Sequence, residues 1–265
     1  MKKIVLGVLI VLVVVVVAFF AVLLGDAFLF EQAADVTNAS FAAEDGTTLI
    51  GYLAQPEGEG PFPAVIMVHE WWGLNAEIRA LADILAQQGY VVLAPDTYRG
   101  RTATTVPGAL FLRISVPEAR VDADMMSAYA YLTTQANVDN ARVGVMGFCY
   151  GGGVALRHGV QNAAIAATIN LYGDMIFDTP GFGALLENDR PVLGIFGAVD
   201  AQIPVAEVEQ FEQALVTAGI PHEVTIYPGV GHAFVNPHSI AQAGAAQEAW
   251  AQILAFLEAN VKNPA

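Results

Sequence analysis

One segment, residues 142–153, constrains the fold of this chain more than any other. Residues 142–147 have the pattern of a buried strand, and residues 150–160 have the spacing of a helix that begins three residues later. Between them lies Cys149, in the frame Gly147-Phe-Cys-Tyr-Gly151. So sharp a turn needs both glycines, because side chains there would collide with the neighbouring strand and helix. The segment therefore predicts a strand–turn–helix unit that raises the thiol above a sheet edge.

The place of Cys149 ahead of a helix is that of a nucleophile. The helix dipole and the free N–H groups of the first turn favour a thiolate and a developing oxyanion. A lone buried cysteine is otherwise an ordinary small hydrophobic residue. The glycines at 151–153 would also suit a phosphate-binding loop, but no Lys-Ser/Thr pair follows them and GxGxxG is absent. We interpret Cys149 as a catalytic nucleophile.

Strands and helices alternate along most of the chain. Residues 36–43 and 47–54 flank an Asp-Gly pair that is typical of a hairpin turn. Further strands are expected at residues 64–68, 90–94, 142–147, 165–171, 191–197 and 223–227, and helices at 76–88, 118–134, 150–160, 205–218 and 240–261. Residues 97–117 have the composition of a long loop, in which a short helix is left open. The alternation predicts an α/β fold: a mostly parallel sheet with helices on both faces.

The N-terminus is a segment of a different kind. Lys2 and Lys3 precede an uncharged run at residues 4–24, which as a helix would span roughly 30 Å, the thickness of a bilayer's hydrocarbon core. This predicts a transmembrane anchor at residues 1–25, with a signal cleaved after Ala27 as the alternative. A linker at 26–35 and one domain at 36–265 follow. The domain is then membrane-anchored and extracytoplasmic, or secreted or periplasmic after cleavage, because the two lysines stay inside.

Charge and cysteine content exclude several classes of function. The 265 residues carry a formal charge of −15, and such a surface is a poor partner for nucleic acid, whose binding needs basic patches. A single cysteine excludes an intramolecular disulfide framework and a four-cysteine zinc site. No HExxH or other metal-ligand spacing occurs in the sequence. We expect no cofactor and no metal, and the sequence indicates no protein partner.

An acid and a histidine follow the cysteine in chain order. Asp200 comes after the strand expected at residues 191–197, and His232 after the strand that ends at residue 227. Both lie in loops beyond the carboxyl ends of strands, where open α/β sheets bind ligands. A neutral imidazole there can take the thiol's proton, and a carboxylate fixes its orientation. Cys149, Asp200 and His232 are therefore predicted to form a catalytic triad.

The segment His69-Glu70-Trp71-Trp72-Gly73 follows the first buried strand. A loop at this place supplies one oxyanion-binding N–H in hydrolases that have a cysteine or serine turn of this kind. We expect the backbone N–H groups of Trp71 and Tyr150 to be the two donors. Glu70 has two interpretations: it holds or accepts the cysteine's proton, or it is a structural residue paired with Arg99 or Arg101.

Taken together, these residues resemble the dienelactone hydrolase family of the α/β-hydrolase superfamily. The resemblance runs from about residue 36 to 260, and it is carried by the following motifs: His69-Glu70-x-x-Gly73, Pro95-Asp96-x-Tyr98, Gly147-Phe-Cys149-Tyr-Gly-Gly, Asp200 and Gly231-His232-x-Phe234. It implies that the cysteine, aspartate and histidine form the triad. It also implies that Glu70 contacts the thiol and deprotonates it once substrate displaces the carboxylate.

The resemblance further implies two arginines that bind a substrate carboxylate. Arg99 or Arg101 could supply the first, each one position away from the family's offset, whereas the second position is occupied by Asn236, which carries no charge. Candidates for an apolar pocket wall are Trp71, Trp72, Tyr98 and Phe234.

The leading hypothesis is a hydrolase of esters or lactones that works through a thioester acyl-enzyme, with a small-molecule substrate. A general carboxylesterase or thioesterase on the same scaffold is the first alternative. A non-catalytic extracytoplasmic binding protein that keeps the fold is the second.

Overall fold

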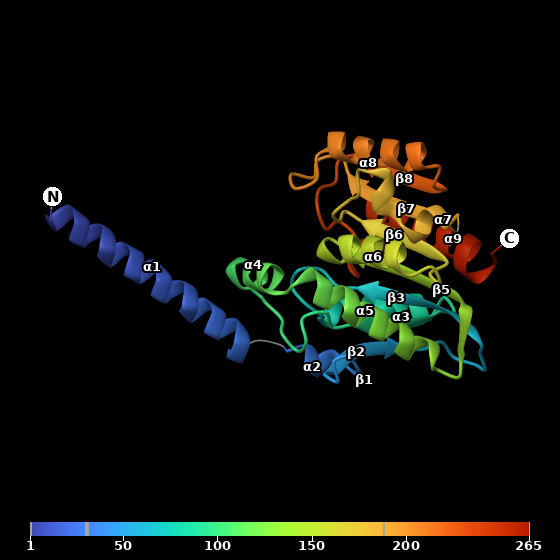
Figure 1. Cartoon of the computed structure of the whole chain (residues 1–265), viewed down its shortest axis with the longest axis horizontal. Helices are drawn as coiled ribbons and strands as arrows, with labels where there is room; N and C mark the ends of the chain where they lie inside the picture. Colours follow the sequence, from blue (N-terminus) through green and yellow to red (C-terminus); the bar gives the residue numbers. More distant parts are fainter. Residues whose placement is uncertain (1, 30–31, 188, 265) are drawn as a thin grey trace.

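The structure is a computed structural model, and it describes residues 2–29, 32–187 and 189–264. Its centre is an eight-stranded sheet with the order β1-β2-β4-β3-β5-β6-β7-β8 (Figure 1). The strands are β1 (Ala39–Ala42), β2 (Thr48–Ala54), β3 (Phe62–Val68), β4 (Val91–Pro95), β5 (Val138–Phe148), β6 (Ala167–Leu171), β7 (Val192–Gly197) and β8 (His222–Tyr227). The β1–β2 hairpin and the β2–β4 pair are antiparallel, and the other pairs are parallel. The expected α/β sheet is confirmed.

Helices cover both faces of this sheet, as the alternation predicted. The larger ones in the domain are α3 (Ala76–Ala86), α5 (Glu118–Thr133), α6 (Tyr150–Gln161), α8 (Val205–Ala218) and α9 (Ala245–Leu257). Side chains of β3 point alternately to two cores: Met67 packs in the core that α3 and α9 cover, and Ile66 in the core that α5 and α6 cover. The carboxyl ends of the parallel strands thus meet at one edge, between two helical layers.

Two regions differ from the sequence-based expectation or complete it. The open question in residues 97–117 is answered by α4 (Val106–Ser115), which begins at the N-cap Thr105. The single closing helix expected at residues 240–261 is wrong: a 3₁₀ turn at Ser239–Ala241 is followed by α9 and then by a π-helical turn at Glu258–Lys262. The helix breaks at Gly244, whose φ of 141° lies outside the helical region. Between β6 and β7 lie a 3₁₀ turn at Thr179–Phe182 and α7 (Ala184–Glu187).

The N-terminal segment is one long helix, α1 (Lys2–Leu29), which extends away from the domain (Figure 1). Its stretch Ile4–Val22 is long and apolar enough to cross a membrane, and none of it is buried. The helix continues past residue 25 into the segment expected as a linker, where α2 (Ala33–Val36) also lies. Residues 30–31 of that linker lie outside the described residues. The C-terminal part of α1 lies beside α4.

Candidate active site

The turn at Cys149 has the geometry that its glycine frame predicted. β5 ends at Phe148, α6 begins at Tyr150, and Cys149 between them has φ 53° and ψ −119°. A side chain at Gly147 would place its Cβ 2.0 Å from the carbonyl oxygen of Gly151, and one at Gly151 would lie 2.4 Å from the backbone of the neighbouring strand β3. A non-glycine residue is strained at a positive φ. The surrounding packing therefore imposes a conformation that directs the thiol out of the sheet edge.

Asp200 and His232 meet at the same edge. His232 Nδ1 lies 2.7 Å from the Asp200 Oδ2, and Asp200 Oδ1 accepts the backbone N–H of Gln202 and of Ile203. Backbone N–H groups therefore hold one carboxylate oxygen, and His232 faces the other. Because a carboxylate only accepts hydrogen bonds, a neutral imidazole here must carry its proton on Nδ1. Among the described residues, His232 Nε2 is buried without a hydrogen-bond partner. A basic nitrogen is thus available toward the cavity.

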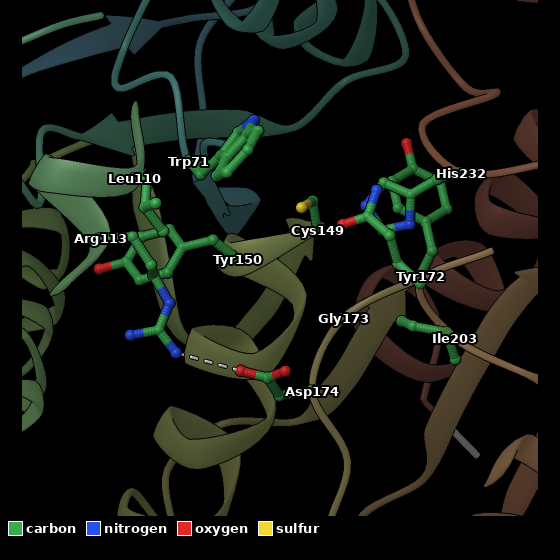
Figure 2. Close-up of a pocket in the computed structure, with 11 residues that line it drawn as sticks. Trp71, Leu110, Arg113, Cys149, Tyr150, Tyr172, Gly173, Asp174, Ile203 and His232 are labelled. Carbon is green, nitrogen blue, oxygen red and sulfur yellow. Dashed lines mark hydrogen bonds and ion pairs between the residues drawn. The ribbon is translucent and has the colours of Figure 1, made fainter. Parts of the chain in front are cut away.

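These groups share a cavity of about 250 Å³. Figure 2 shows Cys149 in its middle, with Trp71 and Tyr150 on one side of the sulfur and His232 on the other. The lining residues are Trp71, Leu110, Arg113, Cys149, Tyr150, Tyr172, Gly173, Asp174, Gln202, Ile203 and His232. Because Nε2 of His232 has no partner, the resting thiol is not hydrogen-bonded to it.

The resting thiol is held in its neutral form. Burial raises the pKa of Cys149 to about 12, and the negative charge of Glu70 contributes in the same direction. Backbone N–H groups of Tyr150 and Trp71 hydrogen-bond to the sulfur and act in the opposite direction, but they are outweighed. The start of the helix favours a thiolate, as expected, but burial outweighs this effect in the unliganded site. The same two N–H groups both point toward the sulfur of Cys149.

Glu70 is itself a perturbed acid. Burial, followed by the charge of Glu77, raises its pKa to about 7. Neither proposed arginine partner pairs with it, since Arg99 binds Asp124 at 2.7 Å and Arg101 donates to a backbone carbonyl. Glu70 does not line the cavity of Cys149 but a second, smaller one of about 90 Å³. A carboxyl group with a pKa near neutrality is poised to accept and release a proton.

A buried histidine holds the peptide group that joins Glu70 and Trp71. His69 is fully buried, and burial lowers its pKa to about 4, so the ring is neutral. Its Nε2 accepts the backbone N–H and the hydroxyl of Thr97, so Nδ1 carries the proton and donates to the carbonyl oxygen of Glu70 at 2.6 Å. That carbonyl belongs to the same planar peptide as the N–H of Trp71. His69, which the sequence-based reasoning left without a role, therefore orients this N–H.

Other residues proposed for the pocket lie outside it. Tyr98 is fully buried and packs edge-on against the His69 ring, and Trp72 packs against Trp71 in the core beside the site. Phe234 packs between Tyr172 and Tyr227, and Tyr172 packs in turn against the ring of His232. Asn236 accepts two backbone N–H groups of its own turn and lines the cavity of Glu70 instead. Trp71 alone of the four proposed wall residues reaches the Cys149 cavity.

The arginine in the cavity is Arg113, which the sequence-based reasoning missed. It extends from α4 over the Tyr150 ring at 5.3 Å and pairs with Asp174 at 3.3 Å (Figure 2). Arg99 and Arg101 do not line this cavity, because the ion pair with Asp124 holds Arg99 against α5, and Arg101 is exposed. The sequence signal that could have identified Arg113 is the helical spacing within residues 106–115. On a helix, residues three apart share one side, and Leu110 and Arg113 both line this cavity. Across residues 2–29, 32–187 and 189–264, no cluster of three or more His, Cys, Asp or Glu side chains could hold a metal ion.

The sheet order, the strained cysteine turn and the Asp–His pair at the sheet edge define an α/β-hydrolase. Comparison with known proteins agrees. A profile of the dienelactone hydrolase family matches residues 49–261. The chain therefore belongs to the dienelactone hydrolase family and is a dienelactone hydrolase-like hydrolase, and the resemblance seen in its motifs is confirmed.

Individual relatives give the same result. A putative carboxymethylenebutenolidase of Synechocystis sp. is 31% identical over 81% of this chain and 93% of its own length. A putative carboxymethylenebutenolidase of Escherichia coli K12 is 30% identical over 84% of this chain and 88% of its own length. The crystal structure of a putative dienelactone hydrolase from Klebsiella pneumoniae superposes with a TM-score of 0.70 at 30% identity, covering 83% of this chain and 99% of that one. A dienelactone hydrolase-like promiscuous phosphotriesterase from metagenomic libraries, at 22% identity, shares the fold with a TM-score of 0.72 over 83% and 96%.

Proposed function

We propose that this protein hydrolyses carboxylic esters or lactones through Cys149 and a thioester intermediate. The observation that carries the proposal is the pairing of His232 Nδ1 with Asp200 at 2.7 Å. This pairing leaves Nε2 buried at the cavity of the thiol, with no hydrogen-bond partner among the residues that the structure describes. A nucleophile, an oriented base and two convergent backbone donors are the groups that acyl transfer requires.

Catalysis begins with proton transfer from Cys149. Substrate entering the cavity brings the thiol and Glu70 together in a drier environment, and the carboxylate takes the proton. The thiolate attacks the carbonyl carbon, and the oxyanion is stabilised by the N–H groups of Trp71 and Tyr150. Collapse of this intermediate forms the thioester and breaks the carbon–oxygen bond of the ester. The proton held by Glu70 returns to the leaving oxygen.

The second half of the reaction uses His232. Its Nε2 takes a proton from water, and the resulting hydroxide attacks the thioester carbonyl. Asp200 stabilises the imidazolium that forms and keeps the ring in place. When the second tetrahedral intermediate collapses, the thiolate leaves and the imidazolium returns its proton to sulfur. The sum is ester plus water to acid plus alcohol.

Arg113 favours a substrate that carries its own carboxylate. Its guanidinium shares the cavity with Cys149. Both of its partners, Asp174 and Glu118, are largely exposed, so an anionic substrate could replace them. This supports a dienelactone-like acid over a neutral ester. A general carboxylesterase or thioesterase would not need this charge.

The experiment compares the full chain with its Cys149→Ala and Arg113→Gln variants on p-nitrophenyl acetate and on a dienelactone. Turnover of both compounds that is lost in Cys149→Ala supports the cysteine hydrolase. A loss in Arg113→Gln confined to the dienelactone supports the acidic substrate. Equal background rates in wild type and Cys149→Ala would favour the binding-protein alternative.

We also propose that α1 is retained as an anchor and that the domain lies outside the cytoplasm. The support is the length of Ile4–Val22, none of which is buried in the domain, and the two lysines that precede it. The mass of the protein in a membrane fraction tests this proposal, because cleavage after Ala27 would remove the first 27 residues and release the domain.

A further inference from the structure

Helix α4 presents an apolar face to solvent. Val106, Leu110, Phe111 and Ile114 have between 39% and 72% of their surface exposed. At 100° per residue they form one continuous arc, while Gly108, Ala109 and Leu112 on the opposite side are buried. Arg113 is the single charged residue in this helix. Contiguous exposed apolar side chains of this size are typical of a surface that binds something.

The location of α4 indicates what it binds. The proposed membrane helix α1 lies against α4. Residues 4–21 of α1 are exposed, whereas Val22 and Gly25 are half-buried, so the covered part lies where the apolar span Ile4–Val22 ends. If that span fills the hydrocarbon core, α4 lies at the level of the lipid headgroups on the exported side (Figure 1).

The apolar face is also the outer side of the active-site wall. Leu110 is exposed on this face and also lines the cavity of Cys149. Arg113, one helical turn further on, lines the same cavity. The cavity of Cys149 therefore borders the surface that α4 presents.

We propose that α4 docks the domain on the surface of a lipid bilayer and that the enzyme takes amphiphilic ester substrates from that bilayer. This inference rests on the proposed hydrolase function and on α1 as an anchor. The membrane partner is a zwitterionic or weakly charged surface, because a domain this acidic is repelled by anionic headgroups. Burial of the α4 side chains among the lipid headgroups and acyl chains supplies the binding energy.

The test uses the full chain reconstituted in phosphatidylcholine vesicles. The variant Phe111→Ser/Ile114→Ser removes two apolar side chains that do not line the cavity. We expect turnover of p-nitrophenyl laurate embedded in the vesicles to fall about tenfold, since two apolar groups no longer enter the lipid. Turnover of water-soluble p-nitrophenyl acetate stays unchanged. The matched control Phe177→Ser/Val216→Ser, whose residues are 50% and 55% exposed, keeps both activities.

A second measurement reports contact directly. When the vesicle acyl chains are brominated, Phe111→Trp should lose a larger fraction of its tryptophan fluorescence than wild type does. Phe177→Trp should lose no more than wild type. An unquenched Phe111→Trp, or undiminished laurate turnover in Phe111→Ser/Ile114→Ser, overturns the docking proposal. Dimers that this double variant converts to monomers would identify the face as a self-association surface instead and also overturn it. Loss of acetate turnover only in Cys149→Ala would leave the hydrolase function standing in either case.

Discussion

Replacing Glu70 by glutamine tests the electrostatic account of the site most directly. The resting thiol of Cys149 has a pKa of about 12, raised first by burial and second by the charge of Glu70. The substitution keeps the shape of the side chain and removes the charge. Cys149 is the only cysteine in the sequence, so its alkylation by iodoacetamide reports on this thiol alone.

The expected magnitude follows from the pKa. A pH of 8 lies about four units below the pKa of Cys149, so about one molecule in 10⁴ carries a thiolate. Ionising the thiol at this pH therefore costs roughly 5 kcal/mol. An ordinary cysteine, with a pKa of about 8.5, is about one quarter ionised at that pH. Cys149 should therefore be alkylated about 10³-fold more slowly than free cysteine. Removing a nearby like charge should lower the pKa by about one unit or more and speed alkylation at least about tenfold.

Turnover should change in the opposite direction. If Glu70 is the base that takes the thiol's proton, Glu70→Gln is alkylated faster and yet hydrolyses p-nitrophenyl acetate more slowly. Glu77→Gln is the control: it leaves the Glu70 carboxylate in place, so alkylation at pH 9, where Glu70 is ionised, should stay at the wild-type rate. An unchanged alkylation rate in Glu70→Gln would show that the thiol does not sense this charge. Undiminished turnover in that variant would remove Glu70 from the mechanism.

Four further outcomes follow from the same structure. Asp200→Asn should lower kcat by up to about 10⁴-fold, because the imidazole loses its orientation, while the alkylation rate of the thiol barely moves. His69→Phe should lower kcat by about tenfold or more and slow alkylation, because the Trp71 N–H is no longer held toward the sulfur; unchanged kinetics in a folded variant would refute this role. Gly151→Ala should lower the melting temperature steeply or prevent folding, since its Cβ would lie 2.4 Å from two backbone carbonyl oxygens. Glu70 binds its proton more tightly when folded, with a pKa of about 7 against 4.5, so its contribution to the free energy of unfolding is full below pH 4.5 and falls by about 3 kcal/mol as pH rises to 7. Urea unfolding should show this slope in wild type and a smaller one in Glu70→Gln.

Much of the fold could be predicted because it depends on local stereochemistry. The sharp turn at Cys149 needs glycine two residues before and two after it, and the sequence contains both. The alternation of apolar strands with amphipathic helices admits few arrangements, since parallel strands need crossover helices on the sheet faces. Because the carboxyl ends of those strands meet at one edge, the order Cys149, Asp200, His232 was enough to predict that the three lie near each other.

What the sequence did not determine depends on contacts between distant segments. Arg99 and Arg113 are both arginines in the region between two strands, and only packing decides that Asp124 binds the first while α4 directs the second into the cavity. The closing helix breaks at Gly244, although its apolar spacing continues on either side. Likewise, the start of a helix favours a thiolate in isolation, but burial and the charge of Glu70 decide the pKa of Cys149. The sequence alone thus determined the scaffold and which residues meet at its carboxyl edge. The tertiary structure decided their charges, their partners and the surface beside them, because desolvation and ion pairing depend on all the neighbours of a group.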